Sequence, residues 1–157
     1  MATEIERKFL INNDDWRASA CRQTKIIQGY LSNSETGSIR VRVSGEKAYL
    51  NIKSMTLGIH RTEFEYPIPL DDAQYMLKNL CLQPVIEKTR YFIEQGRHLW
   101  EIDVFEGENS GLIVAEIELS NTAEEFHKPA WLGIEVSDDP RYYNVCLVDT
   151  PYSQWQT

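Results

Sequence analysis

The sequence predicts a mainly β protein of the α+β kind, with about eight strands in a largely antiparallel sheet and a few flanking helices. Apolar and polar side chains alternate along short segments, as in residues 38–43, where Arg40 and Arg42 alternate with β-branched residues. Short polar turns such as residues 44–46 separate these segments, and such turns are typical of β-hairpins. Apolar residues clearly take helical spacing only at residues 70–80.

Eight alternating segments predict the strands, and Gly58 is the residue expected to open the fifth of them. The predicted strands span residues 3–11, 26–31, 38–43, 47–54, 58–68, 85–95, 98–105 and 112–119. Because most of them are joined by hairpin turns, we expect antiparallel pairing throughout most of the sheet.

Three helices are predicted between and after these strands. Polar residues that can cap a helix precede a short one at residues 15–20. Asp71 lies in the first turn of the helix at residues 70–80, where the helix dipole favours an acid, and Pro84 ends that segment. The tail of the chain is less regular and predicts one further helix at residues 140–148.

Length and composition indicate one globular domain covering residues 1–157, since no linker, repeat or low-complexity segment divides the chain. A net charge of −8 argues against nucleic acid or an anionic membrane as the main partner. No apolar run approaches the roughly 20 residues of a transmembrane helix, and the charged start lacks the apolar region of a signal peptide. Three widely spaced cysteines predict reduced thiols, and we expect a cytoplasmic protein.

Ionised residues recur at alternate positions of strand after strand, so that each strand carries one charged face. The acids are Glu4, Glu6, Glu63, Glu65, Glu101, Asp103, Glu116 and Glu118, and the bases are Lys8, Arg40, Arg42, Lys53, Arg61, Lys88 and Arg90. Carboxylates beside cations suit a ligand that carries both metal ions and negative charge, such as a magnesium-bound phosphate chain.

Two arrangements give this same alternation. The charged faces lie either on the outside around an apolar core, or on the inside of a barrel where they line a water-filled tunnel. Periodicity does not distinguish them, because both arrangements alternate with a period of two. In the tunnel arrangement the apolar faces point outward, and the predicted helices are too few to cover them. That arrangement therefore predicts a homodimer that buries part of the outer surface.

An ordered series of motifs spans nearly the whole chain. It runs through Glu4-x-Glu6-x-Lys8, Gln28-Gly29-Tyr30, Ile39-Arg40-Val41-Arg42, Ile52-Lys53, Arg61-x-Glu63-x-Glu65, Glu87-Lys88-Thr89-Arg90, Glu101-Ile102-Asp103-Val104-Phe105, Glu116-Ile117-Glu118 and Asp139-Pro140-Arg141-Tyr142. This series resembles the CYTH superfamily, the triphosphate tunnel metalloenzymes, and is most similar to its small bacterial members. The resemblance implies an eight-stranded antiparallel β-barrel tunnel with a charged interior that binds a linear triphosphate and a divalent metal.

The resemblance also implies a role for each matching residue. The residues implied to bind the triphosphate are Lys8, Arg40, Arg42, Lys53, Lys88 and Arg90, with Arg61 and Arg141 as additions. The implied metal-binding carboxylates are Glu4, Glu6, Asp103, Glu116 and Glu118, with Glu63 and Glu65 either near the metal or buttressing the bases. Lys8 and Tyr30 resemble a catalytic pair that governs the reaction outcome, although a strand tyrosine can equally be packed on a neighbour.

We therefore expect a Mg²⁺- or Mn²⁺-dependent hydrolase that cleaves inorganic tripolyphosphate to pyrophosphate and phosphate. The alternatives are another enzyme of the superfamily (a class IV-like adenylate cyclase, a thiamine triphosphatase or a nucleoside triphosphatase) and a non-catalytic polyphosphate-binding module. No segment of the sequence indicates a pocket for a nucleobase, which a cyclase needs. A pure anion binder gains little from so many carboxylates. The three histidines are too scattered to predict a catalytic triad or a zinc site.

Overall fold

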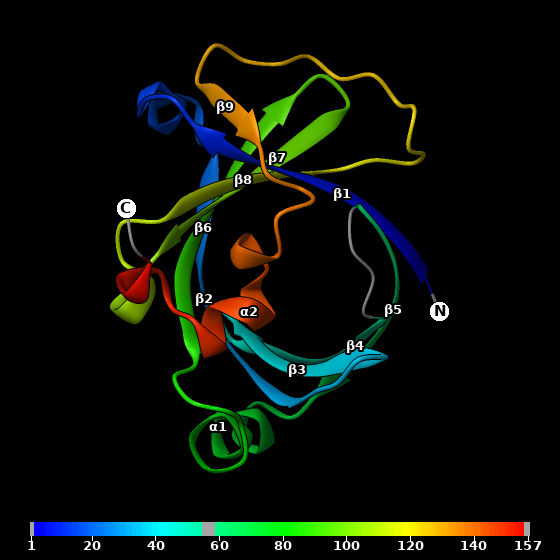
Figure 1. The fold of residues 1–157 in the computed structure, drawn as a ribbon, viewed down its shortest axis with the longest axis vertical. Coiled ribbons are helices and arrows are strands. Elements are labelled where there is room, and N and C mark those ends of the chain that lie inside the picture. Colours follow the sequence, from blue (N-terminus) through cyan, green and yellow to red (C-terminus); the bar gives the residue numbers. More distant parts are fainter. Residues whose placement is uncertain (1, 55–58, 156–157) are drawn as a thin grey trace.

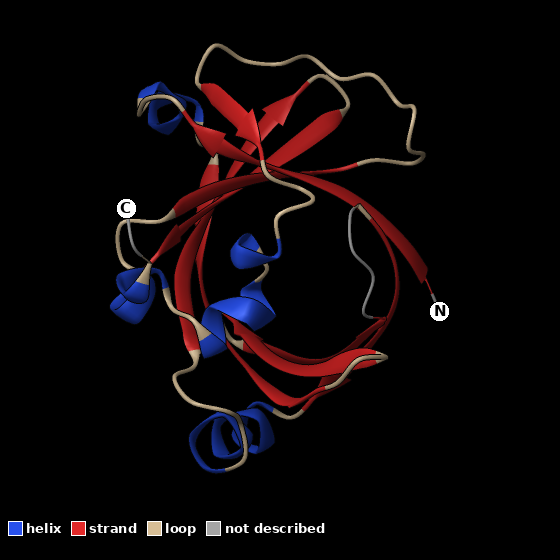
Figure 2. Ribbon diagram, in the orientation of Figure 1, coloured by secondary structure: helices blue, strands red, loops and turns tan. Residues whose placement is uncertain are grey.

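The strands form one antiparallel sheet that closes into a barrel (Figures 1 and 2). The computed structural model describes residues 2–54 and 59–155, and these form nine strands. The strands are β1 (Ala2–Ile11), β2 (Arg22–Asn33), β3 (Gly37–Ser44), β4 (Lys47–Ser54), β5 (His60–Ile68), β6 (Ile86–Gln95), β7 (His98–Phe105), β8 (Ile113–Glu118) and β9 (Leu132–Glu135). Their order is β5-β4-β3-β2-β6-β7-β8-β1-β9, and β5 also pairs with β1.

The pairing of β1 with β5 closes the first eight strands into a ring, with Glu4 opposite Arg61. The predicted eight-stranded antiparallel barrel is therefore confirmed. β9 was not predicted, and this four-residue strand pairs with β1 on the edge opposite β8. Gly58, predicted to open the fifth strand, lies outside the described residues.

The helices of the described residues are short. They are η1 (Asp15–Ser19), α1 (Leu70–Asn79), η2 (Gly107–Asn109), η3 (Pro140–Tyr142), α2 (Asn144–Asp149) and η4 (Tyr152–Gln154). The predicted helix at residues 70–80 is confirmed as α1, whereas the one predicted at 140–148 divides into η3 and α2. None of these helices has the length and apolar character that a membrane span requires.

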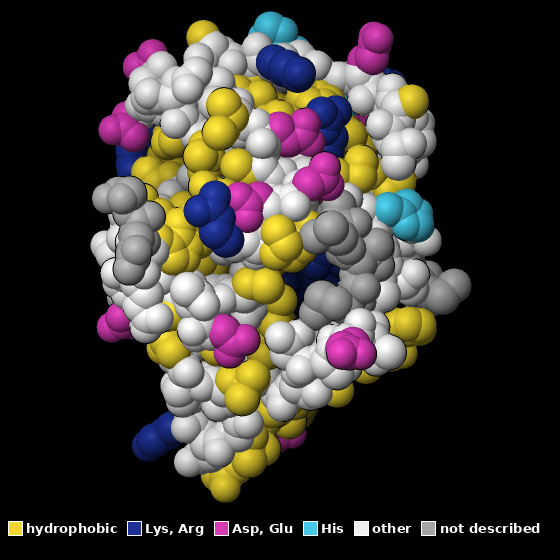
Figure 3. All heavy atoms as spheres, in the orientation of Figure 1, with side chains coloured by type: hydrophobic (Ala, Val, Ile, Leu, Met, Phe, Trp, Pro, Cys, Tyr) yellow, Lys and Arg dark blue, Asp and Glu magenta, His cyan; other side chains and the backbone are white. Residues whose placement is uncertain are grey.

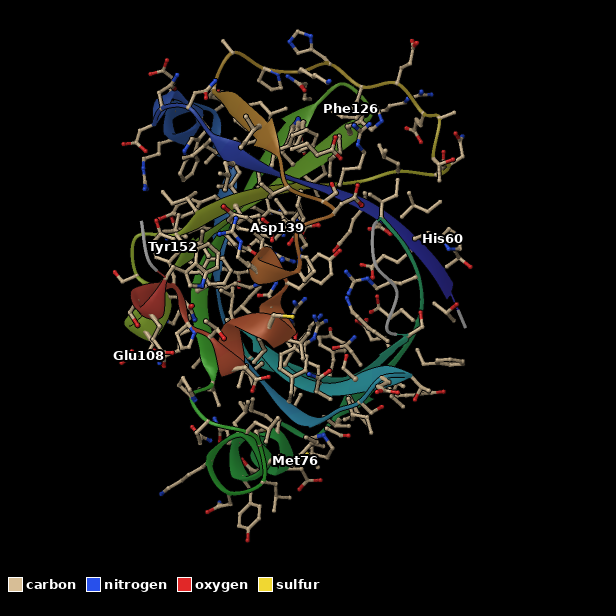
Figure 4. All side chains as sticks on the ribbon, in the orientation of Figure 1. His60, Met76, Glu108, Phe126, Asp139 and Tyr152 are labelled. Atoms are coloured by element: carbon tan, nitrogen blue, oxygen red, sulfur yellow. The ribbon has the colours of Figure 1, made fainter. Side chains whose placement is uncertain are left out.

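α1 covers the outer faces of β2, β3 and β4 (Figure 1). Its side chains Ala73 and Leu77 are buried with Val41 and Cys81, and Met76 in Figure 4 also lies on this helix. The approach is close, because a Cβ added at Gly29 of β2 would lie 2.9 Å from the Cβ of Cys81. Only a glycine at this position lets the segment after α1 lie against the sheet.

A second outer cluster forms over β1, β7 and β8. Phe9, Trp100 and Trp131 are buried there, and Phe126 stacks edge-on against both Phe9 and Trp100 (Figure 4). Phe126 and Trp131 belong to the long connection between β8 and β9, so an irregular segment covers a face that no helix reaches. The helices were expected to be too few to cover the outer faces, and this connection covers part of what they leave. The homodimer stays a prediction.

The third cluster lies inside the barrel. Figures 1 and 2 show η3 and α2 within the ring of strands. The inward side chains of β6, β7 and β8 are charged along most of the tunnel but become apolar at one end, at Ile86, Phe105 and Val114. Val145 and Leu147 of α2 are buried against these residues. The C-terminal segment thus fills one end of the barrel.

Candidate active site

The charged faces enclose a cavity of about 510 Å³ inside the barrel. Figure 3 looks into an opening with basic side chains at its bottom. The cavity is lined by Thr3, Glu4, Glu6, Lys8, Arg40, Arg42, Lys53, Arg61, Glu63, Glu65, Arg90, Glu101, Glu116, Glu118, Tyr143, Asn144 and Val145. Strand alternation explains the convergence, since residues at i and i+2 of each strand face the same interior. The structure therefore brings most of the predicted site residues together.

Four predicted site residues do not line the cavity. Lys88 and Asp103 face inward but are fully buried between the cavity and the apolar closed end, where the Lys88 Nζ lies 2.7 Å from the Asp103 carboxylate. Tyr30 is buried in the apolar cluster at the closed end. Arg141 lies on the surface with its side chain 63% exposed, and it donates hydrogen bonds to Asp139. Their predicted roles in binding and catalysis stay predictions.

Several lining residues were not assigned to the site from the sequence. Glu101 shares its strand face with Asp103, and this spacing could have included it. Tyr143, Asn144 and Val145 enter from the C-terminal segment, which has no alternation to indicate that it faces the tunnel.

Ion pairs within and between strands fix part of the charged wall. The Lys8 Nζ lies 2.6 Å from the Glu116 carboxylate and 3.5 Å from that of Glu6. Burial opposes the charge on Lys8, but Glu116 and Glu6 together raise its pKa. The same pairing with Lys8, against the effect of burial, holds the pKa of Glu116 well below its usual range. Lys53 similarly lies between Glu4, at 3.1 Å, and Glu63, at 3.5 Å.

Two arginines of β3 have no carboxylate partner among the described residues that would balance their charge. Neither Arg40 nor Arg42 has a carboxylate oxygen within 4.0 Å among residues 2–54 and 59–155. The Arg40 Nε is buried without a hydrogen-bond partner, and the Arg42 Nε donates to the side chain of Gln28 at 2.7 Å. Burial, followed by the charges of Arg40 and Arg90, lowers the pKa of Arg42 to about 9. A bound anion would stabilise this group of like charges.

Glu118 of β8 is a carboxylate without a cation partner among the described residues. No cation lies within salt-bridge distance of its carboxylate in the part of the chain that the structure describes. Partial burial and the nearby carboxylates of Glu4 and Glu101 raise its pKa. No three Asp, Glu, His or Cys of the described residues are grouped as a ready-made metal centre. The available donors are carboxylate oxygens, which suit Mg²⁺ and Mn²⁺, and Mg²⁺ commonly completes its ligand set with phosphate oxygens.

Comparison with known proteins agrees with this geometry. Residues 2–143 match the sequence model of the CYTH domain. The chain belongs to the CYTH domain family. The inorganic triphosphatase of Acetivibrio thermocellus is 44% identical over 99% of both chains, and that of Nitrosomonas europaea is 36% identical over 92% of this chain and 96% of its own.

Solved structures share the CYTH fold. An inorganic triphosphatase, NE1496, superposes with a TM-score of 0.67 at 33% identity, covering 94% of this chain and 95% of its own. A putative adenylyl cyclase from Hippeastrum, described as having a dominant triphosphatase activity, superposes with a TM-score of 0.57 over 77% of this chain and 80% of its own. At 13% identity, this second likeness concerns the fold alone.

Between the cavity and the closed end of this CYTH domain, Asp103 contacts two bases at once. Its carboxylate accepts from the Arg90 guanidinium at 2.7 and 3.0 Å and lies 2.7 Å from the Lys88 Nζ. Burial dominates at Lys88, and Arg90 and Arg42 add like charge, so its pKa falls to about 7 although Asp103 is close.

This shift predicts how Lys88 affects stability. The unfolded lysine titrates near ~10.4, so between about pH 7 and 10 the unfolded chain binds more protons there than the folded protein. The contribution of Lys88 therefore becomes more favourable as pH rises through this window. We expect the difference in unfolding free energy, wild type minus Lys88→Met, to increase with pH by up to about 1.4 kcal/mol per pH unit.

Urea denaturation from pH 6.5 to 9.5 measures this difference. Lys47→Met, at the exposed β3–β4 hairpin, is the matched control and should run parallel to the wild type. Parallel curves for Lys88→Met and the wild type would contradict a neutral Lys88 at high pH.

Proposed function

We propose that this CYTH domain is a Mg²⁺- or Mn²⁺-dependent hydrolase that cleaves inorganic tripolyphosphate to pyrophosphate and phosphate. The observation that carries the proposal is the division of charge within one cavity. Arg40 and Arg42 have no carboxylate partner among the described residues, and Glu118 has no cation partner there. A metal-bound triphosphate supplies both missing partners. The two relatives named inorganic triphosphatases support this substrate.

The bases of the cavity recognise the phosphate chain. A linear triphosphate carries about four to five negative charges near neutral pH, since its terminal groups titrate near ~6. Arg40 and Arg42 present guanidinium groups that bind phosphate oxygens bidentately, and Lys53 offers a compact charge. Burial and the neighbouring Arg40 lower the pKa of Lys53, so an anion there would also relieve repulsion.

The acids divide into two groups by their partners. Glu118, Glu116, Glu4 and Glu6 fit a divalent ion, which would neutralise phosphate charge and lower the pKa of an attacking water. Glu63 and Glu65 both accept from the Asn51 amide, at 3.0 and 2.7 Å, and we assign them to buttressing. Asp103, buried between Lys88 and Arg90, is likewise assigned to positioning these bases.

Lys8 is the base closest to the carboxylates assigned to the metal, at 2.6 Å from Glu116. We propose that it stabilises charge on the phosphoryl group under attack. Tyr30 is buried in the cluster that contains Tyr143, so it acts through the packing of the closed end.

The lining of the cavity predicts selectivity against nucleotides. Among the described residues that line it, Tyr143 is the one aromatic side chain, and its hydroxyl donates to the Ser137 carbonyl. Little remains to stack on a nucleobase. We expect tripolyphosphate to have a kcat/KM at least ~10-fold above that of ATP, which corresponds to about 1.4 kcal/mol in transition-state stabilisation.

Steady-state kinetics at saturating magnesium on tripolyphosphate, ATP and pyrophosphate tests both the function and the selectivity. Pyrophosphate should be poor, because it is too short to reach all the bases at once. Cyclic AMP among the products, or ATP equal to tripolyphosphate, would favour a nucleotide enzyme. Tight binding of tripolyphosphate without turnover under any metal would favour a polyphosphate-binding module.

A further inference from the structure

The barrel interior has two zones with a sharp boundary. Along β6 the inward residues are Arg90, Lys88 and then Ile86, and along β7 they are Glu101, Asp103 and then Phe105. Apolar residues from both strands pack with α2, whose Leu147 is fully buried. The tunnel is therefore closed at this end by a plug that is anchored in the hydrophobic core.

Asn144 is the polar residue at the boundary. It begins α2 and lines the charged cavity together with Tyr143 and Val145. Its Oδ1 accepts two hydrogen bonds, from the Lys88 Nζ at 2.9 Å and from the Gln28 Nε2 at 3.1 Å. Because both donors belong to barrel strands, this oxygen fixes the orientation of the side-chain amide.

The nitrogen of the same amide is available to bind a ligand. Among residues 2–54 and 59–155, no hydrogen bond is formed by the Asn144 Nδ2. An amide nitrogen carries two N–H donors and no acceptor. The closed end thus offers a neutral donor beside a base, Lys88, and close to Arg42, which is linked to Asn144 through Gln28.

We propose that Asn144 is a specificity-determining residue that receives the free terminal phosphate of the substrate at the closed end of the tunnel. This inference rests on the proposed function and names the part of the substrate that is read. A terminal phosphate has three unesterified oxygens and can accept from a compact donor in a blind pocket. A phosphate esterified at that end adds a group for which the plug, held by Val145 and Leu147, leaves no path. The site therefore requires a phosphate chain with at least one free end.

Asn144→Asp separates this role from a structural one. Aspartate keeps acceptor oxygens for Lys88 and Gln28, so the plug should stay in place and the thermal midpoint should not fall. The substitution removes both N–H donors and puts a negative charge against the terminal phosphate. Asn121→Asp adds the same charge at an exposed position outside the barrel and is the matched control.

Calorimetric titration with sodium tripolyphosphate in EDTA measures binding independently of turnover. We expect Asn144→Asp to weaken binding at least ~10-fold, as the loss of a hydrogen bond to a charged group implies, and Asn121→Asp to match the wild type. Diadenosine triphosphate, which has the same three phosphates but no free end, should not bind the wild type, whereas ATP should bind weakly.

A weakening of less than ~10-fold in Asn144→Asp, or binding of diadenosine triphosphate as tight as that of ATP, would overturn the assignment. Failure of the protein to hydrolyse tripolyphosphate would instead defeat the proposed function, and it would leave these binding comparisons interpretable.

Discussion

Treatment with EDTA is expected to abolish tripolyphosphate hydrolysis, and added Mg²⁺ or Mn²⁺ should restore it. The reason lies in the carboxylates that face the cavity. Glu118 has a raised pKa because it is partly buried among other acids, Glu4 and Glu101 first among them. Such a group is stabilised by a divalent cation, and a phosphate chain next to it needs the same cation to reduce mutual repulsion.

Phosphate release in EDTA, followed by titration of each metal, measures the effect. The fold should survive chelation, because the buried clusters around Trp100, Val41 and Leu147 are apolar. A thermal midpoint measured in EDTA is therefore the control that separates loss of chemistry from loss of structure. Undiminished turnover in EDTA would contradict a metal-dependent mechanism.

Local pattern was sufficient for most of the barrel. Alternation located all eight strands of the ring, and helical spacing located α1. It did not determine which face is inside, because Arg40 and Val41 alternate identically in both arrangements. The tertiary structure shows the choice, since Arg40 lines the cavity and Val41 packs under α1. Ring closure is equally non-local, because the pairing of Glu4 with Arg61 joins segments far apart in sequence.

The missed elements share one physical property, which is that tertiary contacts rather than local pattern define them. β9 has four residues, too few to show a period, and it pairs only with β1 among the described strands. Arg7, an apparent misfit among the apolar residues of β1, forms an ion pair on the outer side with Glu135 of β9. Alternation put Arg7 on the face opposite Lys8, but neither its outward direction nor its partner could be identified from β1 alone.

The candidate site divides in the same way. Residues carried on alternating strands could be predicted, and the structure places twelve of the sixteen around the cavity. Burial separates two of the others from the cavity. Lys88 and Asp103 have the right spacing and face inward, but they are buried toward the closed end, whereas Asn144 lines the cavity although nothing local marks it. How deep an inward side chain lies in the barrel depends on the length of each strand and on which residues fill the closed end. Alternation encodes neither.

Glu116→Gln is expected to lower kcat/KM for tripolyphosphate at least ~100-fold, in line with the loss of a positioned metal ligand. Glu116 lies between two bases, with one oxygen 2.6 Å from the Lys8 Nζ and the other 3.8 Å from Arg90. Glutamine keeps the shape but removes the negative charge that both bases share. We expect Glu4→Gln to show a loss of the same order, because Glu4 faces the same cavity beside Lys53.

Measuring the binding of tripolyphosphate in the absence of metal identifies the cause of that loss. If Glu116 acts through the metal and the placement of Lys8, its neutral variant should bind tripolyphosphate in EDTA at least as tightly as the wild type, because the cavity has lost one negative charge. Glu94→Gln, at an exposed position on β6, makes the same change outside the site and should leave kcat/KM within about 2-fold of the wild-type value.

A Glu116→Gln variant that is folded and retains more than ~10% of wild-type kcat/KM would remove Glu116 from the metal-binding group. Weaker binding in EDTA together with lost turnover would instead mean that Glu116 maintains the arrangement of the bases, as is proposed for the buried Asp103.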